Sequence, residues 1–395
     1  MSFTLKYFRY LLPRSSVFLN RCDKNSLIIH CQTFKTNTKI QKSYSRWKIL
    51  GLASLIGVGA GVAYSYRKVQ STRYAILNPG SGEKTQILKE LPKVDISRKV
   101  QYPADSSDLK IILFQYPTCP FCCKVRAFLD YFGLSYNVVE VNPVLRQQLK
   151  WSQYKKVPVL LIKVRDGYLQ LNDSSAIIST LTSYFLDREV GLNEVANFYT
   201  TISYLDDDGS EKKEILNRYF LMYHGIIPKD STKETIAEER KWRKWADDVL
   251  VHTLSPNVYR TKDEALQAFT WFSEVGHWKE LFPVWEQYLV VYVGAFAMWI
   301  IGKRLKKKYS LKDDVRQSLY DECNVWLREL KRKGTEFHGG IRPNLADLAV
   351  YGVLSSIEGC VAFSDLMENT KLGPWYSEMK RLISLQAGAP TLFVS

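Results

Sequence analysis

Hydrophobic and polar positions after residue 108 follow a pattern of short strands and helices. Apolar, β-branched runs typical of buried strands are separated by turns and by segments whose apolar residues recur at helical spacing. Gly133 is expected to stop one helix, and Asp173 is a favourable N-cap for another. The expected strands are 110–116, 135–141, 157–162 and 168–172, and the expected helices are 119–132, 143–151 and one from 173 onward. The order βαβαββα predicts an α/β sandwich over residues 109–190.

From about residue 191 the strand alternation disappears and helical spacing dominates, which predicts an all-α domain over residues 191–395. Asn344 and Asp347 have the spacing of a capping box at the start of one helix. The apolar stretch 288–301 has only fourteen residues, which is short for a membrane span and predicts a buried core helix. The expected helices are 211–224, 233–253, 262–275, 283–307, 312–333, 344–358 and 374–386.

The N-terminal part has a different pattern. Residues 1–48 are basic, rich in Ser and Thr and nearly free of acid, which indicates either a mitochondrial targeting segment or a disordered basic tail. Residues 49–66 carry no charge and would span about 27 Å as a helix at about 1.5 Å per residue, so they predict a single transmembrane anchor. Residues 67–108 contain several Pro, Gly and Ser and predict a linker, with a short strand pair in it.

The net charge of +15 is concentrated at the N-terminal end. Residues 1–82 hold thirteen Lys or Arg and one acid, a balance of +12, so the remaining residues carry only +3. A nucleic-acid-binding protein would carry its basic residues on the folded body. The charge therefore belongs to the targeting segment, and we expect no nucleic-acid partner.

Seven cysteines occur without the regular spacing of a disulfide framework, which favours a reducing compartment or one that contains glutathione. Cys119 and Cys122 form a C-x-x-C motif, and zinc is its usual competitor. No second C-x-x-C or H-x-x-x-H completes four ligands, so we expect no metal.

Cys119 is the strongest candidate for chemistry. It lies where a strand turns into a helix, and the unpaired N–H groups of a helix start favour a thiolate. Cys122 comes one turn later and is positioned as a resolving thiol. Tyr116 precedes the motif and is either a donor beside the thiolate or a packed aromatic. Two incidental core cysteines are the plain alternative, which the strand–turn–helix context disfavours.

Two further segments suit a peptide-like ligand. Pro158 in this context is expected to be cis, leaving the Val157 backbone available for pairing with a ligand. Asp173 and Ser174 open a helix, where free N–H groups and a hydroxyl can hold a carboxylate and the aspartate can hold an ammonium group. Together they predict a glutathione site, whereas a simple helix cap is the alternative. His252 is either a solvated or capping histidine or a ligand-binding one.

With these residues in view, the chain resembles the membrane-associated prostaglandin E synthase 2 family of the glutathione-transferase superfamily. The resemblance covers residues 100–386 and the anchor before them. It is carried by the stretches YPTCPFCCKVRAFLDYFGLSYNVVEVNPVLR, KVPVLLIK, QLNDSSAIIS, KWRKWADDVLVHTLSPNVYRT, KRLK and NLADLAVYGVL. The extra Cys123 departs from a plain C-x-x-C.

The resemblance implies a thioredoxin-like domain followed by a helical glutathione-transferase-type domain, and a lipid endoperoxide as the substrate. The implied reaction is isomerisation of prostaglandin H2 to prostaglandin E2, with Cys119 as catalytic thiol and Tyr116 and Cys122 beside it. Glutathione contacts would be Val157, Pro158, Asp173 and Ser174, and haem is a further candidate cofactor, with His252 as its weak contact.

The resemblance also implies a homodimer in the Golgi membrane, or a processed soluble form, whereas the N-terminal composition favours a mitochondrial membrane. Two other functions stay open: a glutathione-dependent thiol–disulfide oxidoreductase, which needs both Cys119 and Cys122, and a non-catalytic membrane-tethered scaffold that binds glutathione or haem.

Overall fold

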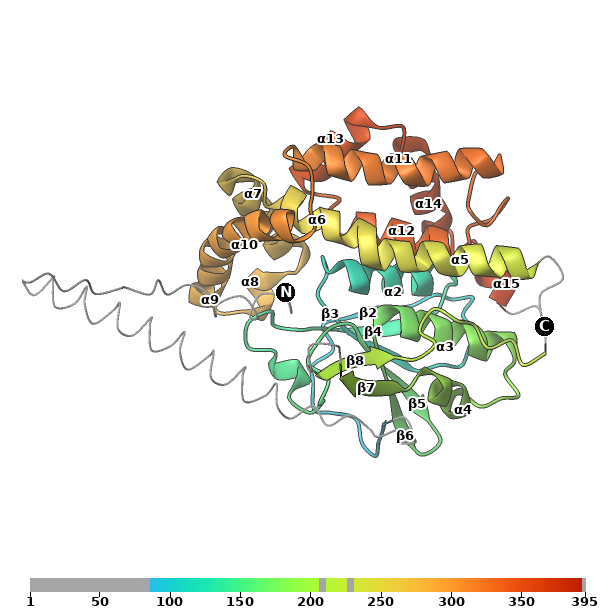
Figure 1. Cartoon of the computed structure of the whole chain (residues 1–395). Helices are drawn as coiled ribbons and strands as arrows, with labels where there is room; N and C mark the ends of the chain where they lie inside the picture. The colour runs from blue at the N-terminus through green and yellow to red at the C-terminus, as the bar shows by residue number, and fades with distance from the viewer. Residues whose placement is uncertain (1–85, 206–210, 226–230, 393–395) are drawn as a thin grey trace, which may run out of the picture. The chain divides into compact units, whose positions relative to one another are not determined.

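The computed structural model describes residues 86–205, 211–225 and 231–392, which fall within one compact unit, Asn78–Ser395 (Figure 1). The expected targeting segment 1–48 and the expected anchor 49–66 lie outside the described residues, so both stay predictions.

The core of the N-terminal half is a six-stranded mixed sheet with the order β1-β6-β5-β3-β4-β2. Its central strand, β3, runs parallel to β4 and antiparallel to β5. The four strands expected from the pattern are confirmed, and their bounds are β3 Ile111–Gln115, β4 Tyr136–Glu140, β5 Val159–Val164 and β6 Gly167–Asn172.

The two edge strands come from the segment expected to be a linker. β1 (Ile87–Leu88) pairs with β6, and β2 (Arg98–Val100) pairs with β4. They lie at opposite edges of the sheet and not beside each other, as the expected strand pair would. The described part of the expected linker, residues 86–108, therefore contributes to the folded body.

Alternate residues of β3 point into two different hydrophobic clusters, as a strand buried on both faces requires. Ile111 and Leu113 pack with helices α2 (Pro120–Tyr131) and α3 (Ser174–Leu186), whereas Ile112 and Phe114 pack on the opposite face. Both helices therefore cover one face of the sheet.

The helix α12 (Leu345–Ser355) packs on α2 from the other side, so that α2 lies between the sheet and the helical half (Figure 1). The contact is close at Gly352, where an added Cβ would lie 2.5 Å from Lys124 Cα. The expected capping box is confirmed, because Asn344 accepts from the Asp347 N–H and the Asp347 carboxylate accepts from the Asn344 N–H.

Most expected helices of the C-terminal half are present. Near residue 250 and near residue 290 a π-helical turn interrupts a longer helix. The bounds are α4 Leu192–Ala196, α5 Lys233–Trp245, α6 Val251–Val258, α7 Lys262–Val275, α8 Trp278–Leu281, α9 Val284–Tyr288, α10 Gly294–Lys308, α11 Val315–Lys333, α13 Val361–Asn369, α14 Gly373–Ser384 and α15 Ala389–Leu392.

The prediction of an all-α second domain is wrong at one place. Strands β7 (Thr201–Leu205) and β8 (Glu211–Ile215) form an antiparallel hairpin where a helix over 211–224 was expected. The charged run EKKE suits a helix by composition, but pairing with the β-branched and aromatic run TISYL outweighs that local preference.

The short helix expected over 143–151 is reduced to a single 3₁₀ turn, Gln147–Leu149. The Asn142 side chain accepts hydrogen bonds from the N–H groups of Val144 and Leu145, at 2.8 Å each. Such a side-chain loop competes with helical hydrogen bonding and explains the failure of the prediction.

The apolar stretch near residue 290 lies in a continuous helix over 284–308, which confirms the helix expected over 283–307. Among the described residues, Val284–Lys308 is the one helix long and apolar enough to cross a membrane by length and composition. Its inner side packs on α7, but seven large apolar side chains on the outer side are exposed. The expectation of a buried core helix is therefore wrong for half of its surface.

Candidate functional site

Cys119 is the N-cap residue of α2, at the carboxyl end of the central strand β3. Its backbone N–H donates to the Tyr116 carbonyl at 3.2 Å, which closes the turn that separates strand from helix. Pro120 occupies the first helical position, where the absence of an N–H costs no hydrogen bond. The local sequence thus places the sulfur at the start of the helix, and the side chain is partly exposed.

The two motif cysteines have opposite acidities. The pKa of Cys119 is lowered to about 6, mainly by a hydrogen bond from the Cys122 thiol and further by the backbone N–H groups of Cys122 and Phe121, against the opposing effect of burial. The pKa of Cys122 is raised well above its ordinary value by burial and by the neighbouring Cys119. Cys119 is therefore the thiolate at neutral pH, and Cys122 is the neutral thiol that donates to it.

Cys123 faces a different environment. Its thiol donates to the Pro117 carbonyl at 3.3 Å, and the Arg126 guanidinium lies 3.1 Å from its sulfur. Arg126 also donates to the same carbonyl at 2.6 Å and to Gln115 at 2.7 Å. Burial raises the pKa of Cys123, so this third cysteine stays protonated and helps to hold the loop before Cys119.

Aromatic side chains lie beside the cysteine pair. Tyr116, Tyr154 and Val157 pack on the sheet face that contains Phe114 and Val159. The pKa of Tyr116 is raised to about 12 by burial, while Arg146 partly offsets the effect. Burial also raises the pKa of Tyr154, with further contributions from Asp173 and Cys119. Both phenols are therefore neutral donors at physiological pH.

The expected cis peptide bond between Val157 and Pro158 is confirmed. The ladder between β5 and β6 begins only at Val159, so Val157 lies just outside it. It packs beside Tyr116 and Tyr154, and the pairing of its backbone with a ligand stays a prediction.

The helix start expected to hold a carboxylate is already capped in part. Asp173 Oδ1 accepts from the N–H groups of Ser175 and Ala176 at 2.9 Å and 3.1 Å, and Asp173 Oδ2 lies 3.7 Å from Arg218 Nη1. Ser174 is buried beside this cap and takes no part in it. Arg218 was missed by sequence reasoning, and its buried Nε has no hydrogen-bond partner among the described residues.

A buried polar cluster joins the two halves of the protein just behind this helix start. Asp247 accepts from the Lys124 ammonium, from Ser175 Oγ at 2.7 Å and from the Tyr219 hydroxyl at 3.1 Å. Lys124 Nζ also donates to Ser175 Oγ at 2.9 Å. The pKa of Asp247 is lowered, since the hydrogen bonds and the nearby Lys124 charge outweigh the opposing effect of burial. Sequence reasoning missed this cluster, although it connects α2, which follows Cys119, to the start of α3.

His252 has other neighbours. Its ring stacks on Tyr309 at 4.1 Å between centroids, and burial together with Lys308 lowers its pKa. Tyr309 covers one face of the imidazole, and the positive charge of Lys308 beside it disfavours a bound iron cation. These residues do not make a fitting haem site, so no chemical step is assigned to haem.

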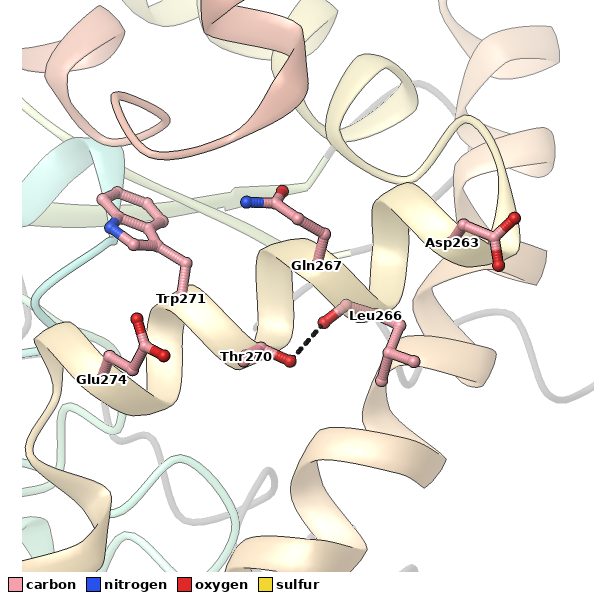
Figure 2. A pocket seen from close by; sticks show the side chains of 6 residues that line it. All are labelled: Asp263, Leu266, Gln267, Thr270, Trp271 and Glu274. Carbon is pink, nitrogen blue, oxygen red and sulfur yellow. Dashed lines mark hydrogen bonds between the residues drawn. The ribbon is translucent and has the colours of Figure 1, made fainter.

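A shallow hollow lies over α7 and is lined by Asp263, Leu266, Gln267, Thr270, Trp271 and Glu274 (Figure 2). All six side chains come from one helix, and none of the expected site residues belongs to it. Thr270 Oγ1 only donates back to the Leu266 carbonyl of its own helix. The hollow does not form part of the Cys119 site.

One group of potential metal ligands lies elsewhere among the described residues, with ligand atoms within 4.8 Å of one another: Glu238, Glu329 and His338. Arg332 pairs with both glutamates at 2.8 Å. The Asn344 oxygen caps α12, so its amide nitrogen donates to His338 Nδ1 and the proton resides on Nε2. A protonated nitrogen cannot ligate a cation, so this group does not suit a metal.

A comparison with protein families agrees with the fold of the N-terminal half. The sequence model for the glutathione S-transferase N-terminal domain matches residues 113–188. Solved structures include glutathione S-transferase III in apo form, 13% identical with a TM-score of 0.39, covering 72% of this chain and 98% of that one. Another is glutathione S-transferase I bound with lactoylglutathione, 16% identical with a TM-score of 0.37, covering 72% and 100%.

Two curated relatives are much closer in sequence. Prostaglandin E synthase 2 of Danio rerio is 44% identical over 340 residues, which cover 85% of this chain and 81% of that protein. Prostaglandin E synthase 2 of Mus musculus is 48% identical over 283 residues, which cover 70% and 71%.

Proposed function

The chain belongs to the prostaglandin E synthase 2 family, and from that premise we propose that it isomerises prostaglandin H2 to prostaglandin E2 through the Cys119 thiolate. Membership makes the protein an enzyme, an isomerase. The observation that supports the thiolate mechanism is the lowered pKa of Cys119, about 6, at the start of α2. A thiol that is ionised near neutral pH is a strong nucleophile without a separate base.

The first step uses the weak O–O bond of the cyclic peroxide. The Cys119 thiolate attacks one peroxide oxygen, so that an S–O bond forms while the O–O bond breaks. The electron pair of that bond moves to the other oxygen, which becomes an alkoxide. A neutral phenol such as Tyr116 can donate the proton that this alkoxide needs, and the raised pKa of Tyr116 keeps that proton available.

The second step restores the enzyme. A base removes the proton from the carbon that bears the S-linked oxygen, and the tyrosinate left by the first step can serve as this base. The C–H electrons form the ketone, the S–O bond breaks, and the sulfur leaves as thiolate. One proton has been given and one regained, so the net reaction is an isomerisation that consumes neither thiol.

Glutathione is the proposed thiol ligand of the same site. The Val157 backbone can pair with its peptide portion, and the buried start of α3 at Ser174 can receive a carboxylate. Arg218 adds a positive charge 3.7 Å from Asp173, which favours the carboxylate end of the ligand over its ammonium end at this position.

Turnover of prostaglandin H2 by the full chain tests the proposal. Because this substrate also rearranges slowly in water, a blank without enzyme gives the baseline. Cys119→Ser should fall to that baseline, and Tyr116→Phe should lose about a hundredfold, the lower end for a lost general acid. The matched control is Cys123→Ser, which changes a neighbouring buried thiol outside the mechanism. Retained turnover in Cys119→Ser would contradict the proposed nucleophile.

A second candidate, thiol–disulfide exchange with glutathione, is favoured by one observation. Cys122 lies against Cys119 as its hydrogen-bond donor and is fully buried, the usual arrangement of a resolving thiol. This reaction needs both cysteines, whereas isomerisation needs only Cys119. The Cys122→Ser variant therefore separates the two functions. It should lose the reduction of a glutathione mixed disulfide if the protein is an oxidoreductase, and it should keep the turnover of prostaglandin H2 if the protein is an isomerase.

A further inference from the structure

The helix over 284–308 exposes an unusually apolar outer side. The outer face consists of Val284, Trp285, Tyr288, Leu289, Tyr292, Val293 and Phe296, whose exposed fractions range from 47% to 67%. Exposed apolar groups are common singly, but a contiguous set of this size marks a contact surface. It recurs at helical spacing along one side of α9 and α10.

The opposite side of the same helix is fully engaged within the protein. Val290, Ala295 and Met298 pack with Phe269 and Trp278 in a small core of their own. α10 lies alongside α7 over much of its length (Figure 1). Since one side is covered by protein, this helix cannot be surrounded by lipid as a spanning helix is, and only the outer face is available to a partner.

Charge follows the aromatic residues along the helix. Lys303 and Lys307 continue the outer face at helical spacing, and Arg304, Lys306 and Lys308 lie beside them. From residue 287 to residue 312 the sequence contains no Asp or Glu. Trp299 lies where the two parts meet, with Lys303 Nζ 3.9 Å from the centre of its ring.

From this arrangement we propose that the outer face docks on the headgroup layer of a membrane that contains anionic lipid. Trp and Tyr concentrate at the boundary between headgroups and acyl chains, because their rings are apolar and their N–H or O–H groups are polar. A helix that lies in the interface combines such an apolar face with basic residues that attract anionic headgroups. Tyr288, Tyr292 and Trp285 supply the first property, and Lys303 and Lys307 supply the second.

A second copy of the chain is a less suitable occupant on grounds of charge. Asp313, just beyond the basic end, already pairs with Lys306 at 3.1 Å, so little acid remains for an identical basic end to pair with. A phospholipid surface offers negative charge beside every part of the face. The body would therefore rest on the bilayer along α9 and α10, independently of the chemistry at Cys119.

Photolabelling of the full chain in vesicles tests this docking. The vesicles contain phosphatidylcholine with or without phosphatidylserine and a trace of phosphatidylcholine that carries a photoactivatable acyl chain. Trypsin releases residues 280–303 as one peptide after Lys279. We expect this peptide to be labelled, more strongly with phosphatidylserine present.

The variant Lys307→Gln lies outside that peptide and should reduce its labelling about fivefold in phosphatidylserine vesicles, with little change in phosphatidylcholine alone, since each basic residue near an anionic surface contributes about a fivefold preference. Combined replacement of Trp285, Tyr292 and Phe296 by Ser should abolish labelling in both vesicles. The matched control, Ile341→Ser, removes an apolar side chain that is 93% exposed on a different segment and should leave labelling unchanged.

Two results would overturn the docking. Labelling of other peptides without 280–303 would show that this face points away from the bilayer. A change from dimer to monomer in the triple variant by mass photometry, with no lipid labelling in the unmodified chain, would assign the face to a second copy. Unchanged far-ultraviolet circular dichroism of each variant shows that the fold is retained.

Discussion

The hydrogen bond from Cys122 to Cys119 should set the pH at which the reactive thiol ionises. It is the largest of the effects that lower the pKa of Cys119 to about 6. A hydrogen bond to a charged group contributes about 1.5–3 kcal/mol, which corresponds to about one to two pH units. Cys122→Ala removes the donor and should therefore move the ionisation midpoint of Cys119 up to about 7–8. Cys122→Ser keeps an O–H donor at the same position, so its midpoint should stay near that of the unmodified protein.

The readout must be the midpoint and not the rate at one pH. At pH 7 a thiol with a pKa near 6 is about nine-tenths ionised, and the Cys122→Ala thiol would be about half to one-tenth ionised. A more basic thiolate is also a better nucleophile, by about threefold for each pH unit. These two changes nearly cancel at pH 7, and a single rate would hide the effect.

The midpoint can be measured directly from the rate of iodoacetamide alkylation of the folded protein between about pH 5 and pH 10, a range that includes the ordinary pKa of a free thiol. Both variants also carry Cys123→Ser, so that the neighbouring thiol does not contribute to the rate. The rate of Cys122→Ala should be half-maximal at the higher pH and should reach a higher plateau. A midpoint in Cys122→Ala equal to that in Cys122→Ser would refute the assigned role of the hydrogen bond and leave only the backbone N–H groups of α2 as its cause.

Two further predictions concern the contact between the halves. Asp247→Asn leaves the Lys124 ammonium buried without a counter-charge and should lower the unfolding free energy by about 3–5 kcal/mol in urea titrations, whereas Asp248→Asn, at the exposed neighbour, should stay within about 0.5 kcal/mol. Because the pKa of Asp247 is lower in the folded than in the unfolded protein, its contribution to the unfolding free energy is present above the unfolded pKa and is lost as the pH falls through the folded pKa. The unfolding free energies of the two variants should therefore converge in acid. Gly352→Ala places a Cβ 2.5 Å from Lys124 Cα and should lower the unfolding free energy by about 1–3 kcal/mol. Gly373→Ala, with no atom within 4 Å of the added Cβ, should leave the unfolding free energy nearly unchanged. Equal losses of stability for both glycines would contradict the close approach of α12 to α2.

The parts of the site that were predictable are those specified by neighbouring residues. The start of α2 follows from a strand, a turn and Pro120 at the first helical position, and the cap of α3 follows from Asp173 itself. Each signal acts over a few residues, so the pattern is sufficient to place Cys119 at a helix start. The acidity of Cys119 is local for the same reason, since its main cause is three residues away.

The parts that were not predictable depend on residues distant in sequence. Asp247 meets Lys124 across 123 positions, and no spacing rule connects an aspartate in one helix with a lysine that follows a C-x-x-C motif. Arg218 reaches Asp173 from the segment after β8, which was itself expected to be helical. The β7–β8 hairpin shows the same limit, because the helical preference of EKKE is local and its pairing partner is not.

The helix over 284–308 shows how a wrong prediction can point to a surface. Its sequence is apolar on all sides from Tyr288 to Ile301, and a helix of that kind is expected to be buried on all sides. The fold supplies a covering element, α7, for only one side, so the hydrophobic pattern exceeds what packing within the chain requires. Exposing large aromatic side chains to water is unfavourable by about 25 cal/mol for each Å² of apolar surface. That excess is difficult to explain by the needs of folding alone, and contact with a bilayer along the outer face would remove it.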